Sequence, residues 1–102
     1  MADETPVEER IGELLSRSDE RLATAESCTG GLVGSRVTDV PGSSDYFDRS
    51  YVTYSYDAKL DLGVSREILD VHGAVSEPVA KAMAQRCRDR AGTTWGIATT
   101  GI

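Results

Sequence analysis

Two periodicities of hydrophobic and polar positions divide the chain into predicted helices and predicted strands. Apolar residues spaced three or four positions apart predict helices over residues 7–16, 32–38, 57–62, 65–71 and 76–91. Runs of β-branched, aromatic or small residues predict strands over 21–26, 50–55 and 95–102, and a short helical turn is expected over 45–48. Helices and strands in this order are typical of an α/β fold with a parallel or mixed sheet.

Two of these segments indicate a buried sheet that is packed by helices. The strand predicted over 21–26 carries small residues such as Ala23 and Ala25, which allow helices to approach the sheet closely. In the helix predicted over 76–91, apolar side chains recur every four positions and form one buried stripe, made of Val79, Met83, Cys87 and Ala91.

The length of 102 residues allows one domain. Residues 1–6 are expected to form a flexible N-terminus and residues 7–102 the domain itself. Three short strands make a small sheet for an independent α/β domain, and no closing helix follows the last of them. The pattern therefore predicts a domain that is incomplete at its C-terminus.

The charge of the chain and its lack of long apolar runs limit the classes of partner. The chain carries 11 positive and 17 negative charges, a net charge of −6. Polyanions repel such a protein, so nucleic acid is not an expected partner. No apolar run approaches the roughly 20 residues that a membrane helix needs, and residues 1–6 lack the features of a secretion signal. A soluble, cytoplasmic protein without membrane contact is expected.

The cysteine and lysine contents add two further expectations. Cys28 and Cys87 lie far apart and form no CxxC or His/Cys cluster, so no metal site is expected. Only two lysines accompany nine arginines and nine aspartates. An acidic, lysine-poor surface suits high salt, where self-repulsion is screened and strong hydration is needed. Ordinary compositional drift is the alternative explanation.

The segment Ser27-Cys28-Thr29-Gly30-Gly31 joins a predicted strand directly to a predicted helix. This geometry lifts hydroxyl groups to the carboxyl edge of a sheet and leaves backbone N–H groups free at a helix N-terminus. Its glycines let a ligand approach the backbone closely, so the loop suits an anion or an oxyanion. The structural alternative is a helix capped by Ser or Thr after a glycine turn.

A serine nucleophile at Ser27 needs a base that accepts its proton. Lys59 is one candidate, since it follows the strand predicted over 50–55 and can reach the same sheet edge. A lysine acts as a base only where its surroundings lower its pKa towards neutrality. Tyr54 precedes it by five residues and suits a proton relay, while His72 fits a solvated loop residue.

Three further residues leave alternatives open. Cys28 is a rival nucleophile, although a small buried hydrophobe is the commoner role of cysteine. Glu26 and Asp57 either orient the lysine or serve as a strand-end charge and a helix cap. Lys59 and Tyr54 also have structural interpretations, as an exposed helix lysine and a sheet aromatic.

Several segments of the chain together form a specific combination: Thr24-Ala25-Glu26-Ser27-Cys28-Thr29-Gly30-Gly31, Asp39-Val40-Pro41-Gly42-Ser43-Ser44, Val52-Thr53-Tyr54-Ser55, Lys59, His72-Gly73-Ala74-Val75-Ser76-Glu77 and Thr100-Gly101-Ile102. With these segments the chain resembles the CinA C-terminal domain family, which includes nicotinamide-nucleotide amidases and competence/damage-inducible proteins. The resemblance runs from about Val7 to the last residue without large gaps.

The resemblance implies a three-layer α/β/α sandwich that hydrolyses the carboxamide of nicotinamide mononucleotide to nicotinate mononucleotide and ammonia, without a metal or cofactor. It implies Ser27 as nucleophile, Lys59 as base and Tyr54 and Thr100 as further catalytic residues. The backbone around Cys28, Thr29, Gly30 and Gly31 would bind substrate and stabilise the oxyanion. Complete family members are expected to be homo-oligomers.

Members of this family continue past Gly101-Ile102 into further elements, so the chain resembles a C-terminally truncated member. An alternative function follows: a catalytically inactive module of the same family that binds a nucleotide or a partner protein. A third possibility is an amidase of the same fold that acts on another substrate.

Overall fold

The computed structural model describes residues 4–102, and residues 1–3 of the expected flexible N-terminus lie outside the described residues. The elements along the chain are α1 (Val7–Ser18), β1 (Leu22–Glu26), α2 (Leu32–Thr38), the 3₁₀ turn η1 (Ser43–Asp45), β2 (Phe47–Val52), α3 (Tyr56–Leu62), α4 (Arg66–His72), α5 (Glu77–Ala91) and β3 (Trp95–Thr99). Within this described part, no helix combines the length and apolar character that a membrane span requires.

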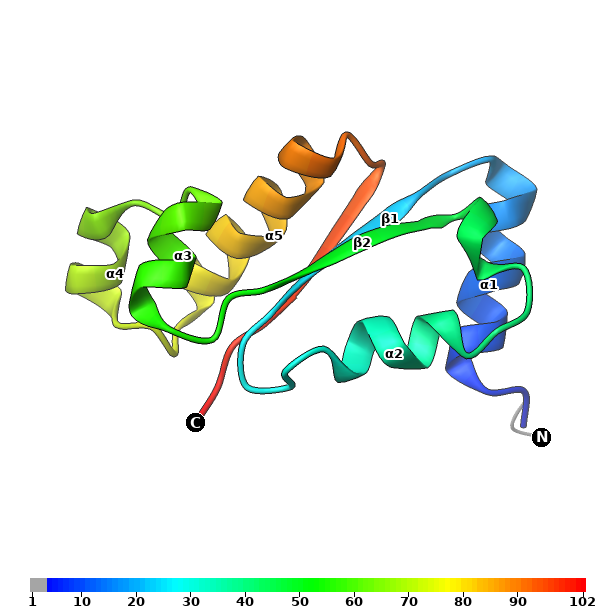
Figure 1. The fold of residues 1–102 in the computed structure, drawn as a ribbon, viewed down its shortest axis with the longest axis horizontal. Coiled ribbons are helices and arrows are strands. Elements are labelled where there is room, and N and C mark those ends of the chain that lie inside the picture. The colour runs from blue at the N-terminus through cyan, green and yellow to red at the C-terminus, as the bar shows by residue number, and fades with distance from the viewer. Residues whose placement is uncertain (1–3) are drawn as a thin grey trace.

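The three strands form one parallel sheet in the order β2-β1-β3, so the parallel form of the expected sheet is confirmed. Helices cover both faces: α1 and α2 lie on one side, and α3, α4 and α5 on the other (Figure 1). This is the expected three-layer arrangement. Because the strands are parallel, their carboxyl ends meet at one edge, where Glu26 pairs with Val52 on one side and Thr99 on the other.

Small residues let α5 pack closely on the central and last strands. Ala23 and Ala25 are completely buried, as are Val79, Met83 and Cys87 of the predicted stripe on α5. Gly96 on β3 marks the closest approach, because a Cβ built there would lie 2.2 Å from the backbone oxygen of Ala84. The apolar pattern of the two elements therefore fixes this layer.

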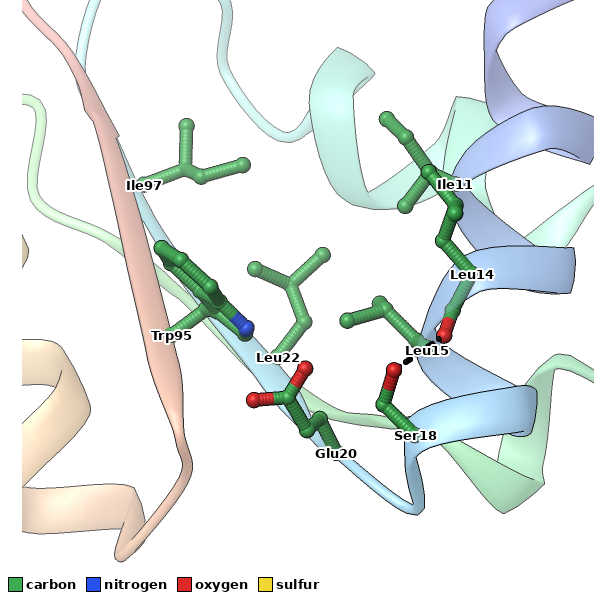
Figure 2. Close-up of a pocket in the computed structure, with 8 residues that line it drawn as sticks. All are labelled: Ile11, Leu14, Leu15, Ser18, Glu20, Leu22, Trp95 and Ile97. Atoms are coloured by element: carbon green, nitrogen blue, oxygen red, sulfur yellow. Dashed lines mark hydrogen bonds between the residues drawn. The ribbon is translucent and has the colours of Figure 1, made fainter.

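The opposite face is only partly covered. Leu15 of α1 and Leu22 of β1 are buried against each other, but Trp95 and Ile97 of β3 remain 53% and 40% exposed. An apolar pocket of about 350 Å³ lies here. Figure 2 shows Trp95 and Ile97 on one wall of the pocket and the α1 residue Leu14 on the other. Among the described residues no helix covers this part of β3, as the three-stranded pattern predicts.

The structure corrects the bounds of three predicted elements near the site. The helical turn lies at Ser43–Asp45 rather than 45–48, and β2 covers Phe47–Val52 rather than 50–55. The strand ends early because the chain turns into α3 at Ser55, whose hydroxyl accepts a hydrogen bond from the Ala58 N–H at 3.0 Å. Tyr54 therefore lies in a link and not in the strand.

The last strand is also shorter than predicted, since β3 covers Trp95–Thr99 and not 95–102. Its ladder ends where the Ser27 N–H donates to the Thr99 carbonyl at 3.0 Å. Beyond it, the Thr100 hydroxyl donates to the Ala74 carbonyl at 2.7 Å, which ties the chain to the loop before α5.

Candidate active site

The carboxyl edge of the sheet brings together two of the residues predicted for catalysis. Ser27 follows β1 directly and is buried, and Lys59 reaches it from the middle of α3. The Lys59 Nζ lies 2.9 Å from the Ser27 Oγ. The sequence separates these residues by more than thirty positions, and the parallel sheet with its following helix closes that gap.

The Lys59 amine is held by backbone carbonyls rather than by a carboxylate. Only 2% of the residue is exposed. Its Nζ also donates to the Thr53 carbonyl at 2.8 Å and to the Tyr54 carbonyl at 3.1 Å. A neutral amine has two N–H groups and one lone pair, so these two carbonyls use both donors. The Ser27 hydroxyl donates to the Tyr54 carbonyl at 3.5 Å. The lone pair of a neutral Lys59, 2.9 Å from the Ser27 Oγ, is the other acceptor within reach of that proton, as a general base requires.

Burial shifts the protonation equilibrium of this amine towards its neutral form. Burial lowers the pKa of Lys59 below its ordinary value, and the neighbouring Cys28 thiol, whose ionised form attracts a positive charge, opposes this shift in part. Within residues 4–102, no carboxylate forms an ion pair with Lys59. Neither Glu26 nor Asp57 therefore orients the lysine, although the sequence left that role open for both.

Glu26 has a different role, which the sequence did not predict. Its carboxylate is completely buried beside Ser27 and accepts hydrogen bonds from the Val33 and Gly34 N–H groups at 2.8 and 2.9 Å. It also accepts bonds from three hydroxyl groups, those of Thr24, Thr29 and Ser50. Burial alone would raise the pKa of Glu26, but the bonds from Gly34, Thr29, Val33 and Ser50 outweigh it and lower the pKa to about 2.

This low pKa predicts an acid-dependent loss of stability. A carboxylate whose pKa falls on folding stabilises the protein above its unfolded pKa of 4.5, and the contribution is lost as the pH falls towards about 2. For a shift of this size the contribution is about 3 kcal/mol. We expect Glu26→Gln to lower the free energy of unfolding in urea strongly at pH 7 and by less than half as much at pH 3. An exposed control, Glu77→Gln, should show no such pH dependence, and parallel pH curves for Glu26→Gln and the wild type would contradict the assignment.

Most of the backbone donors at the start of α2 are already engaged. Val33 and Gly34 donate to Glu26, and the Gly30 N–H donates to the Ser27 carbonyl at 3.0 Å. The expected oxyanion donor at Gly30 is thus occupied. Among the described residues, the N–H groups that have no partner in this loop are those of Cys28, Thr29 and Gly31.

The two glycines of this loop are required by its backbone. Gly30 has a φ of 62° and Gly31 a φ of 112°, conformations that residues with a Cβ rarely adopt. The turn they make places the Cys28 and Thr29 N–H groups directly after Ser27, outside α2. The donors near the nucleophile therefore belong to the loop and not to the helix N-terminus.

The other predicted residues lie at the border of the site. The Tyr54 side chain is 73% exposed, and only its carbonyl contacts Lys59. Thr100 follows β3, with its hydroxyl on the Ala74 carbonyl. Cys28 is exposed, and its Sγ lies 3.0 Å from where a Cβ at Gly101 would stand. His72 is the exposed last residue of α4, not a loop residue as expected.

One signal in the sequence points to a part of the site that was missed. Glu26 is the only charged residue of β1. No signal predicts the part played by Thr53, which contributes its backbone carbonyl and not its side chain. A carboxylate that ends a buried strand and precedes a helix by a few residues indicates a partner at that helix N-terminus. Within the described residues, no group of three His, Cys, Asp or Glu side chains is placed to hold a metal ion.

Comparisons with known proteins show the family of the chain. The family model of the CinA C-terminal domain matches residues 4–102. The chain is 54% identical over 98 residues to a CinA-like protein of Chloroherpeton thalassium, and 55% identical over 97 residues to one of Syntrophobacter fumaroxidans. These matches cover 95% and 94% of this chain but 23% of each relative.

Solved structures give the same result at the level of the fold. The competence/damage inducible protein CihA from Agrobacterium tumefaciens superposes with a TM-score of 0.91 at 42% identity, over 94% of this chain and 59% of that one. A CinA superfamily protein from Escherichia coli gives a TM-score of 0.91 at 35% identity, over 99% of this chain and 61% of that one. The chain thus spans about a quarter of the curated relatives and about three fifths of the solved ones. It belongs to the CinA C-terminal domain family.

Proposed function

We propose that this domain hydrolyses the carboxamide of nicotinamide mononucleotide to nicotinate mononucleotide and ammonia by a Ser-Lys mechanism. The observation that carries the proposal is the contact of the buried Lys59 Nζ with the Ser27 Oγ at 2.9 Å, with two carbonyls on its remaining donors. An amide is a poor electrophile, so its cleavage needs an activated nucleophile of this kind. Membership of the family supports the choice of substrate.

The first half of the reaction forms an acyl-enzyme. The Ser27 Oγ attacks the amide carbon and its proton passes to the Lys59 Nζ. In this proposal the Cys28 and Thr29 N–H groups, which have no backbone partner among the described residues, stabilise the negative oxygen of the tetrahedral intermediate. The C–N bond then breaks, and the Lys59 ammonium gives its proton to the departing nitrogen, which leaves as ammonia.

The second half releases the acid. Water attacks the ester carbon while Lys59 accepts its proton, and the ester bond to the Ser27 Oγ breaks with return of that proton to the serine. In its charged state Lys59 donates to all three of its neighbours, the Ser27 Oγ and the Thr53 and Tyr54 carbonyls. The same neighbours therefore serve both protonation states without rearrangement. In this proposal Tyr54 and Thr100 are further catalytic residues, and Tyr54 assists the proton relay.

The test is the release of ammonia and nicotinate mononucleotide from nicotinamide mononucleotide by this chain, measured over time. Release of the two products in equal amounts supports the amidase. Binding of the nucleotide without release supports the second candidate, a catalytically inactive binding module. That candidate has one observation in its favour: among the described residues, Trp95 and Ile97 leave an apolar face of β3 exposed, as a surface that binds a partner would.

The Lys59 environment predicts the pH dependence of this activity. The base must be neutral, and its pKa is lowered by burial, so activity should rise with pH and level off below the ordinary range for lysine. The measurement is the initial rate of ammonia release across the pH range in which the chain stays folded. Lys81→Met, a change at an exposed lysine, should leave the profile unchanged. A rate that falls as the pH rises through this range would contradict the role of Lys59.

A further inference from the structure

The Glu26 carboxylate joins four parts of the fold through its hydrogen bonds. Its Oε1 accepts from the Thr29 hydroxyl and the Val33 N–H, both at 2.8 Å. Its Oε2 accepts from the Gly34 N–H at 2.9 Å and from the hydroxyls of Ser50 at 2.9 Å and Thr24 at 3.2 Å. The donors come from β1, the loop after it, the start of α2 and β2.

The loop that follows Ser27 has few other anchors. Cys28 and Gly30 are exposed, and two successive glycines with positive φ make the segment costly to hold in one conformation. The Thr29 hydroxyl ties this loop to the body of the domain. It donates a hydrogen bond to the Glu26 carboxylate and makes a second one, of 2.8 Å, with the Thr99 hydroxyl. The position of the Cys28 and Thr29 N–H groups therefore depends on the Glu26 carboxylate.

We propose that Glu26 is a positioning residue that fixes the loop 27–31, so that the Ser27 Oγ meets the Lys59 Nζ and the Cys28 and Thr29 N–H groups face the reacting carbonyl. This inference rests on the proposed Ser-Lys function. Glu26 is not itself a base, because its two oxygens are fully engaged and neither contacts Lys59. Its charge also occupies the N-terminus of α2, so an anionic part of the substrate binds elsewhere.

The test uses Glu26→Gln and a fluorophosphonate, which phosphonylates an activated serine oxygen and releases fluoride. Labelling of Ser27 reports the nucleophile and its base without any need for the natural substrate. A glutamine keeps the size of the side chain, but its NH₂ group cannot accept the bonds that one of the carboxylate oxygens now receives. The freed loop should lower the labelling rate about 10²-fold, the scale for misplaced reacting groups.

Two controls separate positioning from a general loss of stability or charge. Leu69→Ala removes a buried side chain of α4 away from the loop, and Glu77→Gln removes one negative charge at an exposed position. Both should keep the wild-type labelling rate at a temperature where all variants are folded. If Leu69→Ala, at equal loss of stability, slows labelling as much as Glu26→Gln, the positioning role is wrong.

The pH profile of labelling separates positioning from an effect of the Glu26 charge on Lys59. A positioning residue lowers the plateau rate and leaves the inflection, which belongs to Lys59, at the wild-type pH. A shifted inflection with an unchanged plateau would mean that Glu26 acts through its charge, and would overturn the proposal.

A second variant keeps the test decisive if Glu26→Gln does not fold. Thr29→Val removes the loop's hydroxyl bond while the other donors to Glu26 remain, and it should lower labelling about tenfold. An unchanged rate would overturn the inference. The labelling experiment distinguishes failure of the proposed function from failure of this inference. If Ser27 of the wild-type chain is not labelled, the Ser-Lys proposal is wrong. If the wild type and Glu26→Gln are labelled at the same rate, only the role of Glu26 is wrong.

Discussion

Ser27→Ala will abolish the release of ammonia from nicotinamide mononucleotide, and Lys59→Met will nearly abolish it. The Ser27 Oγ and the Lys59 Nζ lie 2.9 Å apart, so each change removes one half of a single nucleophilic unit. Methionine keeps the buried stem of the lysine and removes only the amine. We expect each variant to lose at least about 10⁴-fold in kcat.

The double variant provides the sharper result. Since the two residues act in the same covalent step, removal of both should cost little more than removal of one. Tyr54→Phe keeps the ring and removes only the hydroxyl, so a loss of about 10²-fold is the upper limit for a proton relay at that position. The measurement is the initial rate of ammonia formation by purified variants of equal folded content.

Two matched variants control for nonspecific effects. His72→Ala changes an exposed residue at the end of α4, and Lys81→Met changes an exposed lysine on α5, so both should keep wild-type rates. Full activity of Ser27→Ala would make Cys28 the next candidate nucleophile. If His72→Ala lost as much activity as Ser27→Ala, a Ser-His mechanism would replace the Ser-Lys one.

Gly96→Val will prevent the stable packing of α5 on β3. A Cβ at this position would lie 2.2 Å from the Ala84 backbone oxygen and 2.9 Å from the Arg88 Cβ. The first of these atoms belongs to the helix backbone, which cannot move aside as a side chain does. Overpacking of this kind costs about 3 kcal/mol or more, a large part of the stability of a small domain.

The measurement for this prediction is urea unfolding followed by circular dichroism. The control is Ile97→Val, on the same strand but 40% exposed on the opposite face, for which the loss should stay below about 1.5 kcal/mol. A Gly96→Val midpoint equal to that of the control would mean that α5 can lie farther from the sheet than the structure places it.

Local patterns in the sequence were enough for the α/β order and for the layer formed by α5. The four-residue repeat of Val79, Met83 and Cys87 predicts the buried stripe, and the small residues of β1 predict a helix in close contact. Ser76 and Gly92 mark the ends of α5 correctly because caps act within one turn of the chain. Ser27 and Lys59 were candidates from residue type and position alone.

Element bounds near the site depended on contacts that the local pattern does not contain. The strand predicted to reach Ser55 ends at Val52, since Ser55 caps α3 and its chain direction changes there. Tyr54 consequently presents its carbonyl to Lys59 and its side chain to solvent. Propensity favours a strand through Tyr54, but tertiary hydrogen bonds decide where it stops.

The charge states of the site were decided by the tertiary structure alone. The sequence shows Glu26 and Lys59 as two ionisable residues of opposite sign at one sheet edge, and it left open whether Glu26 orients the lysine. In the fold both side chains are buried, and each forms hydrogen bonds with its own set of partners. The carboxylate accepts from five donors. The amine contacts two backbone carbonyls and the Ser27 hydroxyl. Because a pKa follows from burial and hydrogen-bond partners distant in sequence, one group stays charged and the other is driven towards neutrality.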